Sequence, residues 1–303
     1  MFFLYINLHL AIFRAVHKNY ILNLFHTFLI FTELLAILVL LLFIDGEIID
    51  VALAGALLYF FGFIVAYFSI KKNFKWFNAQ KAQTSLLYFK KIFYPSLSFI
   101  TPSLKTSIII QGTIIFIGTS FNNNLLIFYN SLRIVLNGMK QIISILSASY
   151  FPEITIFFSK NKINKVTKML KNLLIYNGFI SLITFLLLTF FLKEPFLYWT
   201  KGVVEWEFIF FMIFLLSSLI EWVNIPAATF PYAINKHTFL NRLHILSLAI
   251  YWIMLVLLFN NFELYAVPIA LLISNIYFFI HNLIYINNID KLNLNLIKIF
   301  KKK

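Results

Sequence analysis

The sequence contains no cysteine, which excludes disulfide bonds, thiolate metal sites and cysteine nucleophiles. Charge is also scarce, because only 12% of the 303 residues are Asp, Glu, Lys or Arg. Arginine occurs only as Arg14, Arg133 and Arg242, so an arginine inside an apolar segment is more informative than any one lysine. Apolar residues make up 61% of the chain and the mean hydropathy is +0.88, unlike soluble globular domains. The composition therefore predicts a membrane protein.

Long apolar runs are what the sequence has in abundance. A helix needs about 20 apolar residues to cross a bilayer. Eight runs approach or exceed this length, whereas residues 1–13 form a stump that is too short to span. A transmembrane barrel would instead show alternating segments of about ten residues, so we predict an all-α, polytopic membrane helix bundle. The eight predicted spans cover roughly residues 20–44, 48–70, 92–119, 125–150, 172–192, 206–224, 240–260 and 264–286.

The net charge of +14 is concentrated in alternate connections between the predicted spans. By the positive-inside rule, the lysine-rich connections are cytoplasmic, and those near Asp45, Asn123, Glu205 and Glu263 are outside. Orientation and anionic lipid headgroups explain this charge, so membrane lipids are expected partners and nucleic acid is not. The two longest lysine series are Lys71, Lys72, Lys75, Lys81, Lys90 and Lys91, and Lys160, Lys162, Lys165, Lys168 and Lys171.

An internal repeat divides the chain. The pattern A-x-x-K-x-x-x-L-N-x-x-H runs from Ala15 to His26 and recurs 218 positions later, from Ala233 to His244. Both copies enter from the same predicted side, which indicates a parallel repeat in a two-lobe transporter. By this offset, about 126 residues of the first lobe, or about its first three and a half helices, are expected to be missing. The predicted domains are the remnant of the first lobe at 1–70 (the end of span 4, and spans 5 and 6), a basic cytoplasmic linker at 71–91, the second lobe at 92–290 (spans 7 to 12) and a basic cytoplasmic tail at 291–303.

One apolar segment, from about Leu125 to Tyr150, carries polar residues at intervals of three or four. At 100° per residue these fall within about a third of a helix circumference and include two cations. A cation at membrane depth is costly, so such residues normally face a water-filled cavity or a ligand. The segment therefore predicts a membrane cavity for an anion. Its polar residues are Asn130, Arg133, Asn137, Lys140, Ser144 and Ser147, which we call the polar stripe.

The residues around the polar stripe resemble a known family. The order P-S-L-x-x-x-x-P-S-L-K, I-Q-G-T, F-Y-N-S-L-R-I and S-A-S-Y-F-P-E-I begins at Pro95. It is similar to the seventh and eighth spans of O-antigen and related polysaccharide flippases of the multidrug/oligosaccharidyl-lipid/polysaccharide exporter superfamily. Gln111-Gly112, Arg133 and Pro152-Glu153 match the family pattern, whereas residues 121–124 replace its usual glycine-rich turn.

The resemblance implies a two-lobe exporter fold and a transporter of the bacterial inner membrane. Its substrate would be an oligosaccharide on undecaprenyl diphosphate, an O-antigen, capsule or exopolysaccharide unit, and polysaccharide polymerase machinery would be a further partner. Cations can bind the diphosphate through charge-assisted hydrogen bonds, and an arginine can do so with two at once. The expected substrate-binding residues are Lys105, Gln111, Arg133, Asn137 and Lys140.

Glu33 and Glu221 are the clearest acidic residues within predicted spans. They are weaker candidates for coupling transport to protons or sodium, because a carboxylate at membrane depth can exchange a proton during transport. The alternatives are a structural role, or ion pairs with Lys105, Arg133 and Lys140. Two acids cannot neutralise three cations, so pairing alone would leave a positive charge.

No enzyme, metal site or cofactor is expected, because the sequence has no Walker motif, metal-ligand cluster or nucleophile elbow. Two other functions stay open: an inert truncated remnant of a flippase, and a multispanning O-antigen polymerase or ligase. Those enzymes resemble one another in a long external loop with arginines, and here the longest external connection, 193–207, has none. A drug exporter of the same superfamily would favour an acidic cavity, opposite in sign to the polar stripe.

Overall fold

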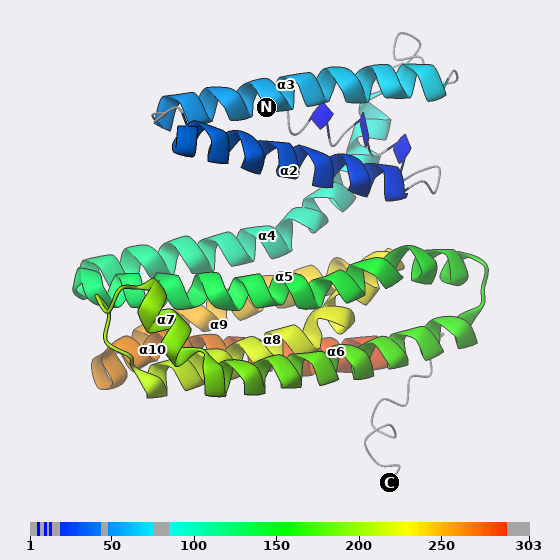
Figure 1. The fold of residues 1–303 in the computed structure, drawn as a ribbon. Helices are drawn as coiled ribbons and strands as arrows, with labels where there is room; N and C mark the ends of the chain where they lie inside the picture. Colours follow the sequence, from blue (N-terminus) through cyan, green and yellow to red (C-terminus); the bar gives the residue numbers. More distant parts are fainter. Residues whose placement is uncertain are drawn as a thin grey trace. The chain divides into compact units, whose positions relative to one another are not determined.

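The structure is a computed structural model that describes residues 5–6, 9–10, 12–13, 19–43, 48–74 and 85–289 (Figure 1). All regular structure in these ranges is helical, which confirms the all-α prediction. The chain divides into two compact units, residues 1–86 and 87–303. The boundary between the units falls inside the predicted linker at 71–91, of which residues 75–84 lie outside the described ranges.

The first unit is built on a pair of packed helices, α2 (Asn19–Phe43) and α3 (Ile48–Asn73). The described residues of the predicted stump are helical, and Ile6 among them is buried in a cluster with Leu29 of α2 and Ile70 of α3. The hydroxyl of Tyr59 donates a hydrogen bond of 2.7 Å to Oε2 of Glu33. Glu33 therefore has a neutral hydrogen-bond donor within its own helix pair.

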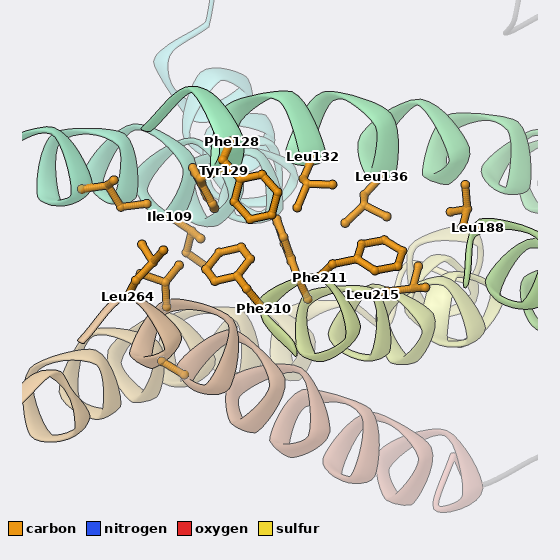
Figure 2. Packing of buried hydrophobic residues seen from close by; sticks show 14 of the residues in the cluster. Ile109, Phe128, Tyr129, Leu132, Leu136, Leu188, Phe210, Phe211, Leu215 and Leu264 are labelled. Carbon is orange, nitrogen blue, oxygen red and sulfur yellow. The ribbon is translucent and has the colours of Figure 1, made fainter. Parts of the chain in front are cut away.

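The second unit is a bundle in which α8 is the central helix. It packs against α5, α6 and α10, and α9 packs against α10. Its N-terminal half forms an aromatic core with α5, where Phe128 and Tyr129 meet Phe210, Phe211 and Leu215 (Figure 2). The helices are α4 (Leu86–Ser120), α5 (Asn123–Ser159), α6 (Ile163–Phe191), α7 (Lys193–Trp199), α8 (Phe208–Ala233), α9 (Thr238–Phe262) and α10 (Ala266–Asn287), with a 3-10 turn η2 (Glu263–Tyr265) between the last two.

Each of the eight predicted spans coincides with one long helix. Six helical segments in the described ranges are long and apolar enough to cross a membrane, and the longest, Thr238–Asn287, contains both α9 and α10. Helix α2 adds a shorter apolar stretch, Leu24–Leu40. The chain is thus a multi-pass membrane protein, while the assignment of connections to the two sides of the membrane stays a prediction.

Helices α5 and α6 are longer than their predicted spans. Helix α5 continues through Pro152 to Ser159, and α6 begins at Ile163 rather than near 172. Tertiary packing explains the extension, because Ile154 of α5 and Val166 of α6 are buried in a cluster with Phe230 of α8. The five lysines at the tip of this hairpin, Lys160, Lys162, Lys165, Lys168 and Lys171, stay exposed.

The repeat corresponds to helix boundaries. Helix α3 begins at Ile48 and α10 at Ala266, 218 positions later. Superposition of the two helix pairs stays a prediction.

Gly112 leaves room on α4 for the side chain of Trp252 in α9. A Cβ atom at this position would lie far inside van der Waals contact of Cζ2 of Trp252. Next to it, Thr113 of α4 and the hydroxyl of Tyr251 of α9 share a buried hydrogen bond of 2.5 Å. Small residues at such contacts and hydrogen bonds between helices are typical of membrane bundles. Gly112 was noted in the sequence only as part of a family pattern, and the structure supplies its physical reason.

We expect Gly112→Ala to destabilise the protein by about 1 to 2 kcal/mol, because the Trp252 ring must move to admit the methyl group. Gly138→Ala in α5 is the matched control, since nothing lies within 4 Å of its Cβ position. Gly138→Ala should stabilise the protein by up to about 1 kcal/mol, because alanine has a higher helix propensity than glycine. Thermal unfolding in detergent micelles measures both. A melting temperature for Gly112→Ala at or above that of Gly138→Ala would contradict the close contact.

A proline in α8 is compensated by an asparagine in α6. Pro226 has no N–H, so the carbonyl of Trp222, four residues earlier, loses its partner within the helix. The Nδ2 atom of buried Asn177 donates a 2.6 Å hydrogen bond to this carbonyl. In a membrane such freed backbone groups must be satisfied by neighbouring helices. Asn177 thus holds α6 against α8 at the point where α8 is interrupted.

Replacing Asn177 by leucine should destabilise the protein by about 1 to 3 kcal/mol, because the Trp222 carbonyl is left buried and unpaired. Pro226→Ala restores an N–H to that carbonyl. In the Pro226→Ala background, Asn177→Leu should therefore cost clearly less. Thermal unfolding of the four proteins of this double-mutant cycle measures the difference. Equal costs in both backgrounds would show that Asn177 does not serve the proline.

Candidate anion-binding site

A cavity lies inside the second unit, between α4, α5, α8 and α10. It has a narrow part of about 70 Å³ and a wide part of about 480 Å³, which also reaches α9. By volume, the narrow part holds a few waters and the wide part a small ligand group. The two parts adjoin, because six residues line both: Lys105, Thr106, Asn137, Lys140, Glu221 and Asn275.

The polar stripe of α5 supplies one wall of this cavity. Arg133 lines the narrow part, Asn137 and Lys140 line both parts, and Ser144 lines the wide part. Helical periodicity places these side chains on one face, and the opposite face of α5 is left to apolar residues. Asn130 and Ser147, at the two ends of the stripe, do not line the cavity.

Lys140 and Glu221 form an ion pair across the cavity. Lys140 Nζ donates to Glu221 Oε1 at 2.5 Å, joining α5 to α8, and both side chains stay partly open to the cavity. The alternative in which the acids pair with the cations is therefore met for Glu221 and Lys140. Glu33 accepts its hydrogen bond from Tyr59 in the first unit. Ion coupling by either carboxylate stays a prediction.

Lys105 and Arg133 have no carboxylate partner in the described part of the chain. Nε and Nη2 of Arg133 donate to Asn130 Oδ1 at 3.1 and 2.6 Å, which orients the guanidinium without neutralising it. Lys105 Nζ lies 4.7 Å from the ring centroid of Phe278, a cation–π contact. With three cations and one carboxylate, the described cavity lining carries a formal charge of +2.

The narrow part ends against the aromatic core. Tyr129 and Phe214 line it, and their rings are stacked at 5.6 Å with an interplanar angle of 9°. Both belong to the cluster of buried residues between α5 and α8 that Figure 2 shows in part. The cavity therefore widens toward Pro102, Ser144 and Thr229 and is bounded by apolar packing at the other end.

Four of the five predicted substrate-binding residues come together, and one does not. Lys105, Arg133, Asn137 and Lys140 line the cavity, whereas Gln111 is exposed on α4 and lines neither part. Helical periodicity explains this, because Gln111 lies six residues from Lys105 and therefore on another face of α4. The sequence had singled out Gln111 through the family pattern and not through periodicity.

Several lining residues were not predicted from the sequence. Asn224 and Thr229 of α8, His244 of α9 and Asn275 of α10 complete the polar wall of the wide part. His244 had been noted in the sequence only as the last residue of the repeated pattern. A lone polar side chain such as that of His244, within a predicted span, was the available signal.

The arrangement suits an anion held by charge-assisted hydrogen bonds, with the Arg133 fork deep in the cavity and the Lys105 and Lys140 ammonium groups around it. Comparison with models of protein families, with curated proteins and with solved structures gives no match for the chain. No group of three or more His, Asp or Glu side chains able to hold a metal ion occurs among the described residues. What the cavity binds must be inferred from its lining.

We expect Glu221→Gln and Lys140→Met each to destabilise the protein by about 1 to 3 kcal/mol. The loss should exceed that of a surface pair and stay below that of a fully buried one, because the pair faces a cavity. The double variant should cost less than the two single costs together. Thermal unfolding in micelles measures the cycle, with Glu194→Gln on exposed α7 as a control that should change nothing. Additive losses would show that the two groups do not interact.

Proposed function

We propose that the protein is a transporter that moves a lipid-linked oligosaccharide, carried on a polyprenyl diphosphate, across a bacterial inner membrane. The observation that carries this proposal is the pair of cations, Lys105 and Arg133, which have no carboxylate partner among the described residues of a membrane-spanning bundle. The resemblance of residues 95–153 to polysaccharide flippases supports the same substrate class.

The energetic argument starts from the cost of these cations. A cation in a membrane-spanning segment is expensive unless it is paired or solvated. Glu221 is engaged by Lys140, so the remaining charge is available to a ligand. A diphosphate supplies the opposite charge and oxygen acceptors that match an arginine fork. An uncharged lipid would gain nothing from these side chains.

The geometry of the cavity supports the proposal further. The wide part has the volume of a small-ligand pocket and is lined by both apolar and polar side chains. A diphosphate cannot cross about 30 Å of hydrocarbon unaided. A cationic cavity within the spans lowers that barrier by replacing the water that the anion loses. The oligosaccharide, the lipid and the membrane are the partners in this proposal, and polysaccharide polymerase machinery would act on the product.

Binding of farnesyl diphosphate to the full chain in detergent micelles tests the proposal, with farnesol as the uncharged comparison. We expect Arg133→Gln and Lys105→Gln each to weaken diphosphate binding about ten- to a hundredfold, the value of about 1.5 to 3 kcal/mol for hydrogen bonds to charged groups. Arg133→Lys should give a smaller loss, because it keeps the charge and removes the fork. Farnesol binding should not change.

Arg242→Gln is the matched control, since Arg242 is exposed on α9 and does not line the cavity. A second readout is movement of a fluorescent polyprenyl diphosphate sugar between leaflets of proteoliposomes containing the full chain. Equal affinity for farnesol and farnesyl diphosphate would overturn the proposal. So would unchanged binding in both Arg133→Gln and Lys105→Gln, provided that their melting temperatures match the wild type.

A further inference from the structure

His244 is a buried polar side chain whose hydrogen bonding is incomplete. It belongs to α9, lines the wide part of the cavity and is only 8% exposed. Its Nδ1 atom has no hydrogen-bond partner. Its ring lies 4.5 Å from that of Phe278 in α10. A buried nitrogen without a partner costs free energy, and native structures usually satisfy such groups with water or a ligand.

Several other polar side chains of the wide part have partners of their own. Asn275 Nδ2 donates to the carbonyl and hydroxyl of Ser217, Asn224 Oδ1 accepts from Asn282, and Ser144 donates to the carbonyl of Gln141. Among the lining residues of the wide part, as far as the structure describes them, His244 alone has a buried side-chain atom without a partner. His244 therefore has hydrogen-bonding capacity that the described residues leave unused.

The position of His244 relates it to the cationic residues. Phe278 is contacted by the His244 ring and also by Lys105 Nζ. A ligand group that reaches His244 would thus lie next to a group held by Lys105, separated by one aromatic ring. The histidine χ2 torsion is broad and roughly twofold, so a half-turn of the ring can bring a nitrogen to the cavity wall.

We infer that the wide part of the cavity is a binding site for a sugar, in which His244 hydrogen-bonds a hydroxyl or amide group of the residue attached to the diphosphate. This inference rests on the proposed function and names a second part of the same site. The neighbouring side chains favour such a ligand, because Gln141, Ser144, Asn224 and Thr229 are neutral amides and hydroxyls. A hydrocarbon chain in this place would leave the imidazole unsatisfied.

The test compares farnesyl diphosphate with the same lipid carrying one N-acetylglucosamine on its diphosphate. The wild-type full chain should bind the sugar-bearing lipid more tightly. His244→Phe keeps a ring of similar shape and removes both nitrogens, so it should weaken binding of the sugar-bearing lipid about three- to tenfold. Binding of the bare diphosphate should not change. His244→Gln keeps a donor and an acceptor and should restore part of the lost affinity.

His281→Phe is the control for loss of an imidazole, because His281 is hydrogen-bonded to the Tyr277 carbonyl and does not line the cavity. Equal affinities of the wild type for the two lipids, or equal losses for both in His244→Phe, would overturn the sugar site. Arg133→Gln should weaken both lipids alike, so it reports on the anion site separately.

Failure of the proposed function gives a different pattern. If the wild type does not bind bare farnesyl diphosphate, binding of a farnesyl N-acetylglucosaminide without phosphate is measured to test the sugar site alone. If this neutral glycolipid binds and its binding depends on His244, the sugar site is supported and the diphosphate is not part of the recognised ligand. Absence of binding by all three lipids would overturn both.

Discussion

The ion pair between Lys140 of α5 and Glu221 of α8 is the interaction on which the character of the cavity depends. It consumes the one carboxylate that lines the cavity, so Lys105 and Arg133 keep an uncompensated charge in the described lining. It also joins the polar stripe to the central helix of the unit. A bundle of this kind tolerates cations at membrane depth only where a cavity or a ligand replaces bulk water. The same pair thus contributes both to helix packing and to the sign of the site.

The rest of the second unit satisfies polar groups between helices. Asn177 donates a hydrogen bond to the Trp222 carbonyl, which Pro226 leaves without a partner in α8. Asn282 donates to Asn224 at 2.8 Å and so links α10 to α8. Lipid cannot supply hydrogen bonds, so each of these groups needs a protein partner, and each partner restrains one helix against another. Six buried side-chain atoms of the described residues lack a partner, among them Oδ1 of Asn177 and of Asn282, and of these six only His244 Nδ1 belongs to a residue that lines the cavity.

The fold and one wall of the cavity could be predicted because both depend on local pattern. The length of the apolar runs predicted the helices, and a helical period of 3.6 residues predicted that Arg133, Asn137 and Lys140 lie on one face of α5. Which of the three cations pairs with Glu221 could not be predicted, because this depends on the register of α5 against α8. The extension of α5 and α6 to a tight hairpin was missed for the same reason, since residues such as Val166 are buried by α8. Gln111 is the opposite case, in which a family pattern singled out a residue that lies outside the cavity.

The aromatic boundary of the narrow part has an electrical consequence. Tyr129 and Phe214 stack where the cavity meets the apolar core. Membrane voltage falls mainly across regions that exclude water, so most of the field in this unit would act on that core and little on the wide part. Each elementary charge that crosses the core would gain or lose about 2.3 kcal/mol per 100 mV. With the predicted orientation, a voltage negative on the inside would push an anion outward, which is the direction of the proposed transport.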